Sequence, residues 1–191
     1  MKFGFMSEGE TPENESYYHR YMDLIREVQW AEEMGFDFFA SSEQHFTFGA
    51  TISAPECLYS YLFPLTKRIR FRHAVALLPQ RINHPLRVAE RIATEDILSG
   101  GRIELGVGRA NTSLIVKAFQ VNPEDTRDEV KEGLDIIRQS FTEEPFQYKG
   151  RFFDIPKRYM IPQPMQRPYP PLSMAATSPD SMEMAAREGL G

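Results

Sequence analysis

Short apolar runs alternate with amphipathic segments of helical spacing along this chain, and the joints between them are short. The apolar runs cover residues 2–6, 36–40, 70–77, 103–107 and 172–176. Apolar residues at helical spacing predict helices over residues 21–34, 54–65, 85–99 and 128–142. Such alternation favours a parallel sheet with right-handed crossovers, which is an α/β fold. The periodicity does not separate a closed (β/α)8 barrel from an open doubly wound sheet.

Local signals set the ends and faces of these helices. Gly35 suits the position after the first helix, and Asn83-His84-Pro85 is a typical helix start. In the helix that follows, we expect the apolar positions to face inward, namely Leu86, Ala89, Ala93 and Ile97. Trp30 and most of the nine methionines are assigned to core packing.

The bulk composition excludes several classes of protein. A chain of 191 residues with 41% hydrophobic and 26% charged residues is expected to form one domain, spanning residues 1–191. The net charge of -5 gives no basic field to attract nucleic acid or anionic lipid. A lone cysteine, Cys57, no leader-like start and no long apolar run together predict a cytoplasmic protein without a membrane span. His45, His73 and His84 lack metal-ligand spacing, so no metal site is predicted.

One segment, residues 145–171, interrupts the alternation. It holds seven of the 14 prolines and several aromatic residues, which is too apolar for a disordered linker. We expect a hairpin followed by an extended loop that packs over one end of the sheet.

Two strand ends carry polar side chains that predict an active-site face. The run Gly106-Val107-Gly108-Arg109 presents a guanidinium beside glycines, which suits an anionic cofactor group, although a surface salt-bridge arginine is the alternative. The run Ser41-Ser42-Glu43-Gln44-His45 follows an earlier strand. Because carboxyl ends of parallel strands meet at one edge, we expect both groups on the same face.

A third polar group follows the last predicted strand. In Thr177-Ser178-Pro179-Asp180-Ser181, Ser178 suits the N-cap and Pro179 the first helical position. Unpaired N–H groups at a helix start attract phosphate, but ordinary capping is the alternative. The carboxylate of Asp180 would compete with an anion for this positive end.

Taken together, these motifs resemble the bacterial luciferase-like family of flavin-dependent monooxygenases, which are (β/α)8 barrels. The resemblance runs almost from end to end, and the ordered set is specific although each motif alone is weak. It rests on the opening Met1-Lys2-Phe3-Gly4, Glu43 to Phe46, Asn83-His84-Pro85, Ser99 to Arg102, Gly106 to Arg109, Tyr148 to Phe153 and Pro162-Gln163-Pro164. About five of the eight barrel units are present, so we expect this chain to be part of a longer one.

The resemblance implies roles for particular residues. It places the flavin phosphate at Gly108 and Arg109, with Arg127, Thr177, Ser178 and Ser181 completing the site. It implies a cis peptide at Ala74-Val75 against the flavin ring, where core packing is the alternative. Glu43, Gln44 and His45 would face the reactive edge. Gln44 stands where oxidising members usually carry a histidine, which puts the acid–base step in doubt because an amide carries no exchangeable catalytic proton.

The implied function is a monooxygenase that takes reduced FMN (FMNH2) from a separate flavin reductase and oxidises a small organic substrate through a hydroperoxyflavin. Residues 145–171 would then shield the reaction from water. One alternative is a deazaflavin (F420)-dependent oxidoreductase, and another is a non-catalytic flavin-binding or partner subunit. The resemblance also implies a homodimer or heterodimer.

Overall fold

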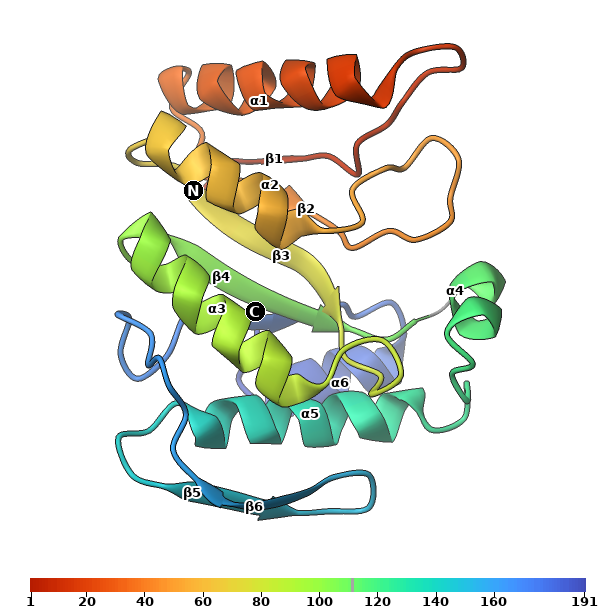
Figure 1. Cartoon of the computed structure of the whole chain (residues 1–191), viewed down its shortest axis with the longest axis vertical. Coiled ribbons are helices and arrows are strands. Elements are labelled where there is room, and N and C mark those ends of the chain that lie inside the picture. Colours follow the sequence, from red (N-terminus) through yellow and green to blue (C-terminus); the bar gives the residue numbers. More distant parts are fainter. Residues whose placement is uncertain (111) are drawn as a thin grey trace.

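Five parallel strands form one sheet in the computed structural model, which describes residues 1–110 and 112–191. In sheet order they are β1 (Gly4–Met6), β2 (Phe38–Ser41), β3 (Arg70–Leu77), β4 (Ile103–Gly108) and β7 (Leu172–Met174). All four pairings are parallel, so the five carboxyl ends lie at one edge (Figure 1). The predicted α/β fold with a parallel sheet is confirmed. Within the described residues β1 and β7 have one strand neighbour each, so barrel closure stays a prediction.

Helices connect the strands and cover the sheet. After successive strands come α1 (Tyr17–Glu33), α2 (Pro55–Leu62) with the 3-10 turn η1 (Phe63–Leu65), α3 (Pro85–Ser99), α5 (Thr126–Ser140) and α6 (Pro179–Arg187). Figure 1 shows α2, α3 and α5 side by side. A further short helix, α4 (Ser113–Ala118), lies beyond the carboxyl end of β4, and the sequence did not predict it.

The inward face of α3 differs from the prediction at one position. Ala89 and Ala93 are fully buried as expected, but Ile97 is 42% exposed, so its assignment to the core is wrong. Its neighbour Asp96 takes the inward position with no exposed surface. The Asp96 carboxylate accepts two hydrogen bonds from Gln166, at 2.8 Å from the backbone N–H and 2.7 Å from the side-chain amide. Because a buried carboxylate needs such partners, this polar contact fixes the rotation of the last helical turn.

The single tryptophan is also on the surface. Trp30 is 56% exposed and Met34 is 71% exposed, so assigning them to the core is wrong. The buried stripe of α1 is narrow and consists of Leu24, Ile25, Val28 and Ala31. Trp30 follows Val28 by two positions, which is about 200° around a helix and therefore points away from that stripe.

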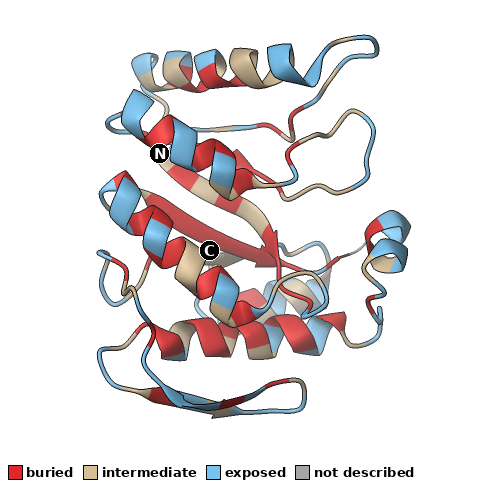
Figure 2. Cartoon of the chain, in the orientation of Figure 1, coloured by how far each residue is buried: buried red, intermediate tan, exposed pale blue. Residues whose placement is uncertain are grey.

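An aromatic cluster fills the layer between the strands and helices. The rings of Phe39 and Tyr59 lie 5.8 Å apart, nearly perpendicular, and Phe39 contacts Phe71 at 6.4 Å in a similar geometry. The buried Tyr59 hydroxyl accepts the Ser41 backbone N–H at 2.8 Å and donates to the Arg72 carbonyl at 2.7 Å. Figure 2 shows the buried residues on β2, β3 and β4 and on the helix faces turned toward them. This core keeps the carboxyl ends of the central strands in place.

The proline-rich segment forms a hairpin and an extended loop, as predicted. Strands β5 (Phe146–Lys149) and β6 (Asp154–Arg158) pair in antiparallel fashion below α5 (Figure 1). The Glu132 carboxylate on α5 accepts the backbone N–H groups of Arg151 at 2.8 Å and Phe152 at 3.1 Å in the hairpin turn. The hairpin is thus held against a helix, outside the sheet.

The loop after the hairpin reaches the amino ends of the strands. The side-chain amide of Gln166 donates to the Ile103 carbonyl at 2.8 Å, and its oxygen accepts from Arg70 at 2.9 Å. Both partners stand at strand starts. Side-chain contacts of Gln166 tie this loop to the edge opposite the predicted site, whereas Arg151 in the hairpin turn pairs with Asp125 at the start of α5. The shielding expected of residues 145–171 is therefore wrong for this loop and stays a prediction for the hairpin.

Candidate functional site

A small pocket lies at the carboxyl ends of β4 and β7, where α5 and α6 begin. Its internal volume is about 50 Å³, well below the roughly 300–1,000 Å³ of pockets that enclose a whole ligand. It would fit one phosphate-sized end of a larger molecule. Six residues of the predicted phosphate site line it, namely Gly108, Arg109, Arg127, Thr177, Ser178 and Ser181. The structure therefore brings these six together; their role as phosphate ligands stays a prediction.

The serines of this pocket form a capping box at the start of α6. The Ser178 hydroxyl accepts the Ser181 backbone N–H at 3.3 Å, and the Ser181 hydroxyl accepts the Ser178 backbone N–H at 2.9 Å. Pro179 occupies the first turn, where its missing N–H costs nothing. The predicted capping is confirmed. Capping and anion binding share this positive helix end, so the two interpretations do not exclude each other.

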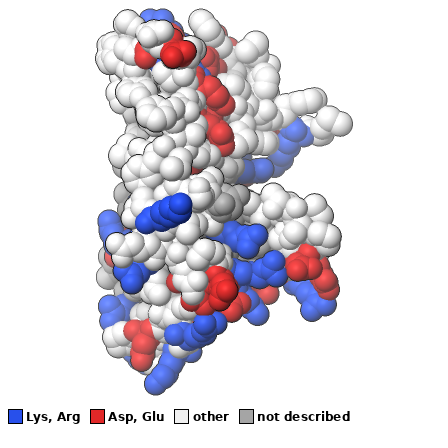
Figure 3. All heavy atoms as spheres, turned by 90° about the vertical axis from the view of Figure 1, so that its right-hand side faces the viewer, with Lys and Arg blue, Asp and Glu red and all other residues white. Residues whose placement is uncertain are grey.

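Two guanidinium groups give the pocket a net positive charge. Arg109 is exposed and makes no ion pair with any other described residue. Arg127 lies 3.3 Å from the Asp180 carboxylate, and the two side chains are 52% and 73% exposed. Asp180 thus pairs with Arg127, in addition to lying in the first helical turn. Figure 3 faces the carboxyl edge and shows Lys and Arg side chains gathered in the half that contains α5.

The pocket adjoins β3 through a close contact between Gly108 and Val75. Gly108 leaves no room for a side chain, since a Cβ there would lie 2.3 Å from Cγ2 of Val75. The Ala74-Val75 peptide is cis, as the resemblance implies, and lies where the β3–β4 register shifts. The glycine at 106 likewise has no room, because a Cβ would lie 2.3 Å from the His73 carbonyl oxygen. Close packing of β3 and β4 therefore requires glycine at both positions, and the role of Gly108 at the ligand site stays a prediction.

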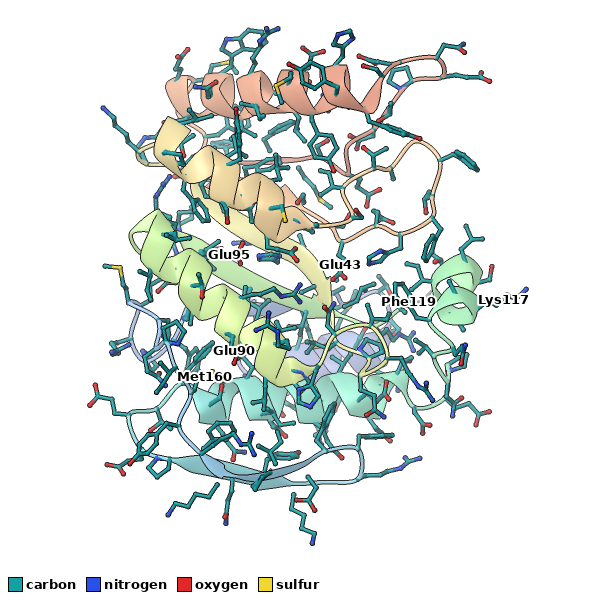
Figure 4. The ribbon with its side chains drawn as sticks, viewed as in Figure 1. Glu43, Glu90, Glu95, Lys117, Phe119 and Met160 are labelled. Atoms are coloured by element: carbon teal, nitrogen blue, oxygen red, sulfur yellow. The ribbon has the colours of Figure 1, made fainter. Side chains whose placement is uncertain are left out.

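Glu43 lies at the carboxyl end of β2 (Figure 4). Its side chain is only 10% exposed, and both carboxylate oxygens accept hydrogen bonds. One oxygen lies 3.0 Å from His45 Nε2, and the other accepts the Leu77 backbone N–H at 2.9 Å. Asn83 donates to both oxygens at 3.0 and 3.1 Å. Burial raises the pKa of Glu43, but the hydrogen bonds from His45, Leu77 and Asn83 outweigh it and hold the pKa below the usual value. Glu43 therefore clamps the end of β3.

His45 points away from Gln44, toward Glu43 and Phe119. Its ring contacts Phe119, with centroids 5.1 Å apart and planes nearly perpendicular, and its Nε2 lies against Glu43. Figure 4 shows Phe119 beside α4 at the same edge. One ring nitrogen of His45 faces the Glu43 carboxylate, and the ring packs nearly perpendicular to Phe119. His45 is therefore held in one orientation.

Gln44 points toward β1 instead. Its side-chain amide donates to the Glu8 carboxylate at 2.9 Å and to the Ser42 hydroxyl at 3.1 Å. Gln44 also lines an open hollow of about 520 Å³ between the start of α1 and residues 46–53. We call this the aromatic hollow; the other residues that line it are Tyr17, Tyr21, Phe46, Thr47, Phe48, Ala50, Thr51 and Ser53.

Sequence reasoning missed two partners of this site. Glu8 lies just after β1, so the same strand-end rule could have identified it. The second is the buried pair of His73 and Glu95, whose Nε2 and Oε2 atoms lie 2.9 Å apart behind Glu43. Burial lowers the pKa of His73, but the charge and hydrogen bond of Glu95 raise it by more, so the pKa of His73 lies above its ordinary value. Figure 4 shows Glu95 on α3.

Residues 1–110 and 112–191 hold neither a cluster suited to a metal ion nor a helix suited to span a membrane. No three His, Cys, Asp or Glu side chains there come together in a way that could hold a metal ion. No helix in the same residues has the length and apolar character needed to cross a bilayer.

The fold and site define an α/β protein with a cationic pocket at the carboxyl ends of a parallel sheet. The sequence matches the luciferase-like monooxygenase family over residues 1–191, and the chain belongs to this family.

Several similar curated proteins are named as monooxygenases. The 4-hydroxyprotoasukamycin monooxygenase of Streptomyces nodosus subsp. asukaensis is 31% identical over 164 residues, which are 85% of this chain and 44% of the relative. The oxygenase component of the flavin-dependent trigonelline monooxygenase of Acinetobacter baylyi is 26% identical over 171 residues, which are 88% of this chain and 47% of the relative. The chain thus spans about half the length of the curated relatives it matches.

Solved structures agree with this assignment. Monooxygenase RslO1 from Streptomyces bottropensis has a TM-score of 0.92 and 29% identity, covering 100% of this chain and 58% of that one. The oxygenating constituent of 3,6-diketocamphane monooxygenase from Pseudomonas putida, in complex with FMN, has a TM-score of 0.87, 23% identity and coverage of 100% and 56%. An F420-dependent secondary alcohol dehydrogenase has a TM-score of 0.79, 19% identity and coverage of 96% and 55%. The last two, below 25% identity, show the fold alone.

Proposed function

We propose that this chain contributes the flavin- and substrate-binding face of a monooxygenase that uses reduced FMN and O2 to oxidise a small organic molecule. One observation carries the proposal. The pocket of Arg109 and Ser178 adjoins Val75 through Gly108, and the Glu43 backbone N–H donates to the Val75 carbonyl at 3.2 Å. These contacts place the pocket, Val75 and the strand end before Gln44 in sequence along the carboxyl edge, which supports assigning them to the phosphate, the ring and the reacting edge.

The residues of the pocket fit a phosphate. In this proposal Arg109 and Arg127 neutralise its charge, and the start of α6 at Thr177, Ser178 and Ser181 supplies N–H and hydroxyl donors. The exposed Arg127–Asp180 pair is worth at most about 1 kcal/mol, and a phosphate monoester carries about -1.5 to -2 charge. A phosphate can therefore displace Asp180 from Arg127.

The wall beside the pocket is assigned to the flavin ring. In the proposal Ala74 and Val75 contact the ring, and reduced FMN, when bound, supplies the electrons that activate O2. Glu43 holds the end of β3 against β2 through Leu77, which keeps this wall in position. Gln44 and His45 then face the reacting edge from β2.

Binding of reduced FMN and of reduced riboflavin under anaerobic conditions tests the phosphate site. Riboflavin lacks the phosphate, so the wild type should bind FMN about 10- to 100-fold more tightly, as expected for charge-assisted hydrogen bonds. The Arg109→Gln variant should lose much of this preference, while Arg127 and the start of α6 retain the rest. Arg26→Gln is the matched control, because Arg26 is an exposed arginine of α1. Equal affinity of the wild type for FMN and riboflavin would contradict the proposal.

Oxygen chemistry needs its own measurement. Labelled O2 in the presence of a flavin reductase should place label in an oxidised product and consume O2. Tight binding of F420 without O2 consumption would support the F420-dependent oxidoreductase instead, a fold neighbour of this chain.

A second candidate, a non-catalytic flavin-binding subunit, is favoured by the contacts of the three polar residues. Glu43 and His45 bind each other, and Gln44 has no titratable proton. A Gln44→His variant would set an imidazole beside the Glu8 carboxylate. Turnover that appears only in this variant would support the subunit, and turnover already present in the wild type would exclude it.

The proposal includes a separate flavin reductase and a dimer. The name of the trigonelline relative, an oxygenase component, supports the first. Homodimer and heterodimer remain the two arrangements proposed for the second.

A further inference from the structure

The orientation of the Gln44 amide is decided by its neighbours. The Gln44 nitrogen lies 2.9 Å from Oε1 of Glu8 and 3.1 Å from the Ser42 hydroxyl oxygen, and that hydroxyl lies 2.8 Å from the same Glu8 oxygen. A carboxylate only accepts, so the Ser42 proton goes to Glu8 and the Ser42 oxygen accepts from Gln44. Both contacts of the amide therefore require its NH2 group. The opposite orientation would set three oxygens against one another.

Two backbone hydrogen bonds also hold Glu8 and Gln44 next to each other. The Gln44 backbone N–H donates to the Ile52 carbonyl at 2.9 Å, and the Ile52 N–H donates to the Glu8 carbonyl at 3.3 Å. Ile52 has no exposed surface. Glu8 and Gln44 are thus fixed to one buried residue, and neither side chain has to be ordered when a ligand arrives.

With the NH2 group engaged, the amide oxygen of Gln44 is left as an acceptor. No donor of the described residues reaches it within hydrogen-bond distance. Gln44 lines the aromatic hollow, whose volume of about 520 Å³ lies within the roughly 300–1,000 Å³ of small-molecule sites.

Three of the five side-chain hydroxyls that line the hollow already donate to backbone carbonyls, whereas those of Tyr17 and Ser53 bond to no other described residue. Tyr21 donates to the Thr51 carbonyl at 2.9 Å, Thr51 donates to the Gly9 carbonyl at 2.9 Å, and Thr47 donates to the His45 carbonyl at 3.3 Å. No Lys, Arg or His of the described chain lines the hollow. Its walls are aromatic, with Phe48 98% exposed and Tyr17 59% exposed. The hollow therefore offers aromatic surface, acceptors and the hydroxyls of Tyr17 and Ser53, but no cation for an anionic ligand.

We propose that Gln44, oriented by Glu8, is a specificity-determining residue that accepts a hydrogen bond from a hydroxyl or N–H donor on a flat apolar substrate bound in the aromatic hollow. This rests on the proposed function, since it names the substrate class of that site. Glu8 acts through Gln44 as a positioning residue. A residue that both donates and accepts would not select for a donor in this way, because it could turn to suit either kind of ligand.

Phenol and anisole test this, because they differ in one donor proton: phenol can donate and anisole cannot. Binding is followed by titration of the protein's NMR spectrum without flavin. The wild type should bind phenol about tenfold more tightly than anisole, the worth of one hydrogen bond that would otherwise leave a group unpaired. In Gln44→Met, which keeps the length and removes the acceptor, the ratio should fall to about one.

The Glu8→Gln variant tests the positioning. An amide at position 8 can donate as well as accept, so Gln44 is no longer confined to one orientation and the phenol preference should fall below the wild-type ratio. Glu13→Gln, in the same loop but exposed and outside the hollow, is the control and should keep the ratio. Phe48→Ala should weaken the binding of phenol and of anisole equally.

Three results would overturn the inference: the same phenol-to-anisole affinity ratio in the wild type and Gln44→Met, tighter binding of anisole than of phenol by the wild type, or no binding of either compound. These outcomes are independent of the flavin test. If the protein does not bind FMN but still prefers phenol, only the proposed function is contradicted. If it binds FMN but does not prefer phenol, only the role of Gln44 is contradicted.

Discussion

Gly108 of β4 and Val75 of β3 touch so closely that a Cβ on residue 108 would lie 2.3 Å from Val75 Cγ2. This contact joins the cationic pocket to the wall proposed for the flavin ring. Gly108→Ala should therefore cost about 1–3 kcal/mol of unfolding free energy through overpacking and weaken binding of reduced FMN. Urea unfolding and anaerobic titration measure the two effects.

The matching variant is Gly108→Ala with Val75→Ala, which removes the opposing methyl groups. It should recover most of the stability lost in the single variant. If the double variant is no more stable than Gly108→Ala alone, the contact is not the cause.

Substitutions of Ser178 separate its capping from its proposed ligand role. Ser178→Ala should lose about 1 kcal/mol of stability, the usual worth of an N-cap, and weaken FMN binding. Ser178→Asp should keep the cap, because aspartate caps helices well, but its charge repels a phosphate. The two variants should thus differ in stability while both bind FMN poorly, with riboflavin binding less affected. Ser178→Asp binding FMN as the wild type does would argue against a phosphate at this helix start.

The buried His73–Glu95 pair makes stability depend on pH. The pKa of His73 lies above the ordinary 6.5 in the folded protein, since Glu95 outweighs the opposing effect of burial. A raised histidine pKa gives stability that is fully present below the unfolded value and is lost as pH rises through the folded value. The free energy of unfolding should thus decrease as pH rises above about 6.5.

Urea unfolding at several pH values, on the wild type and His73→Asn, measures this contribution. In His73→Asn the free energy of unfolding should no longer show the decrease that this pair causes as pH rises. His19 is an exposed histidine of α1, so His19→Asn should keep that decrease. An unchanged pH dependence in His73→Asn would show that the pair does not titrate in this range.

Asp96 anchors the loop that follows the hairpin. Asp96→Asn places an NH2 group against a donor of Gln166, so we expect a loss of about 1.5–3 kcal/mol and faster proteolysis within residues 159–171. Asp154→Asn, an exposed carboxylate on β6, is the control. Equal proteolysis of the two variants would mean that other contacts hold the loop.

The strands were predictable because each is a short apolar run between turn signals, and β3 has the predicted ends, Arg70 and Leu77. Helix α4 was not, since its six residues are too few for an amphipathic stripe. Ile97 was placed inward by spacing alone, yet the partner that draws Asp96 inside is Gln166, 70 positions away. Spacing carries no information about such contacts.

Some residues of the candidate site could likewise be predicted from local sequence patterns, and others could not. Arg109 and Ser178 follow strands, so local patterns identify them, whereas Arg127 entered through family resemblance. Its neighbour Asp180 lies 53 positions along the chain and meets it only in the folded protein. The orientation of Gln44 depends on Glu8 after β1 and Ser42 after β2 at once, and no local pattern contains that information.

The attachment of Gln166 to the amino ends of β3 and β4 makes the loop of residues 159–171 suitable for protein engineering. Exchanging this loop among relatives, or carrying a fluorescent label on it, changes the side of the molecule that faces away from the pocket and the aromatic hollow. Heat tolerance could thus be selected there while ligand preference is selected separately at the other edge.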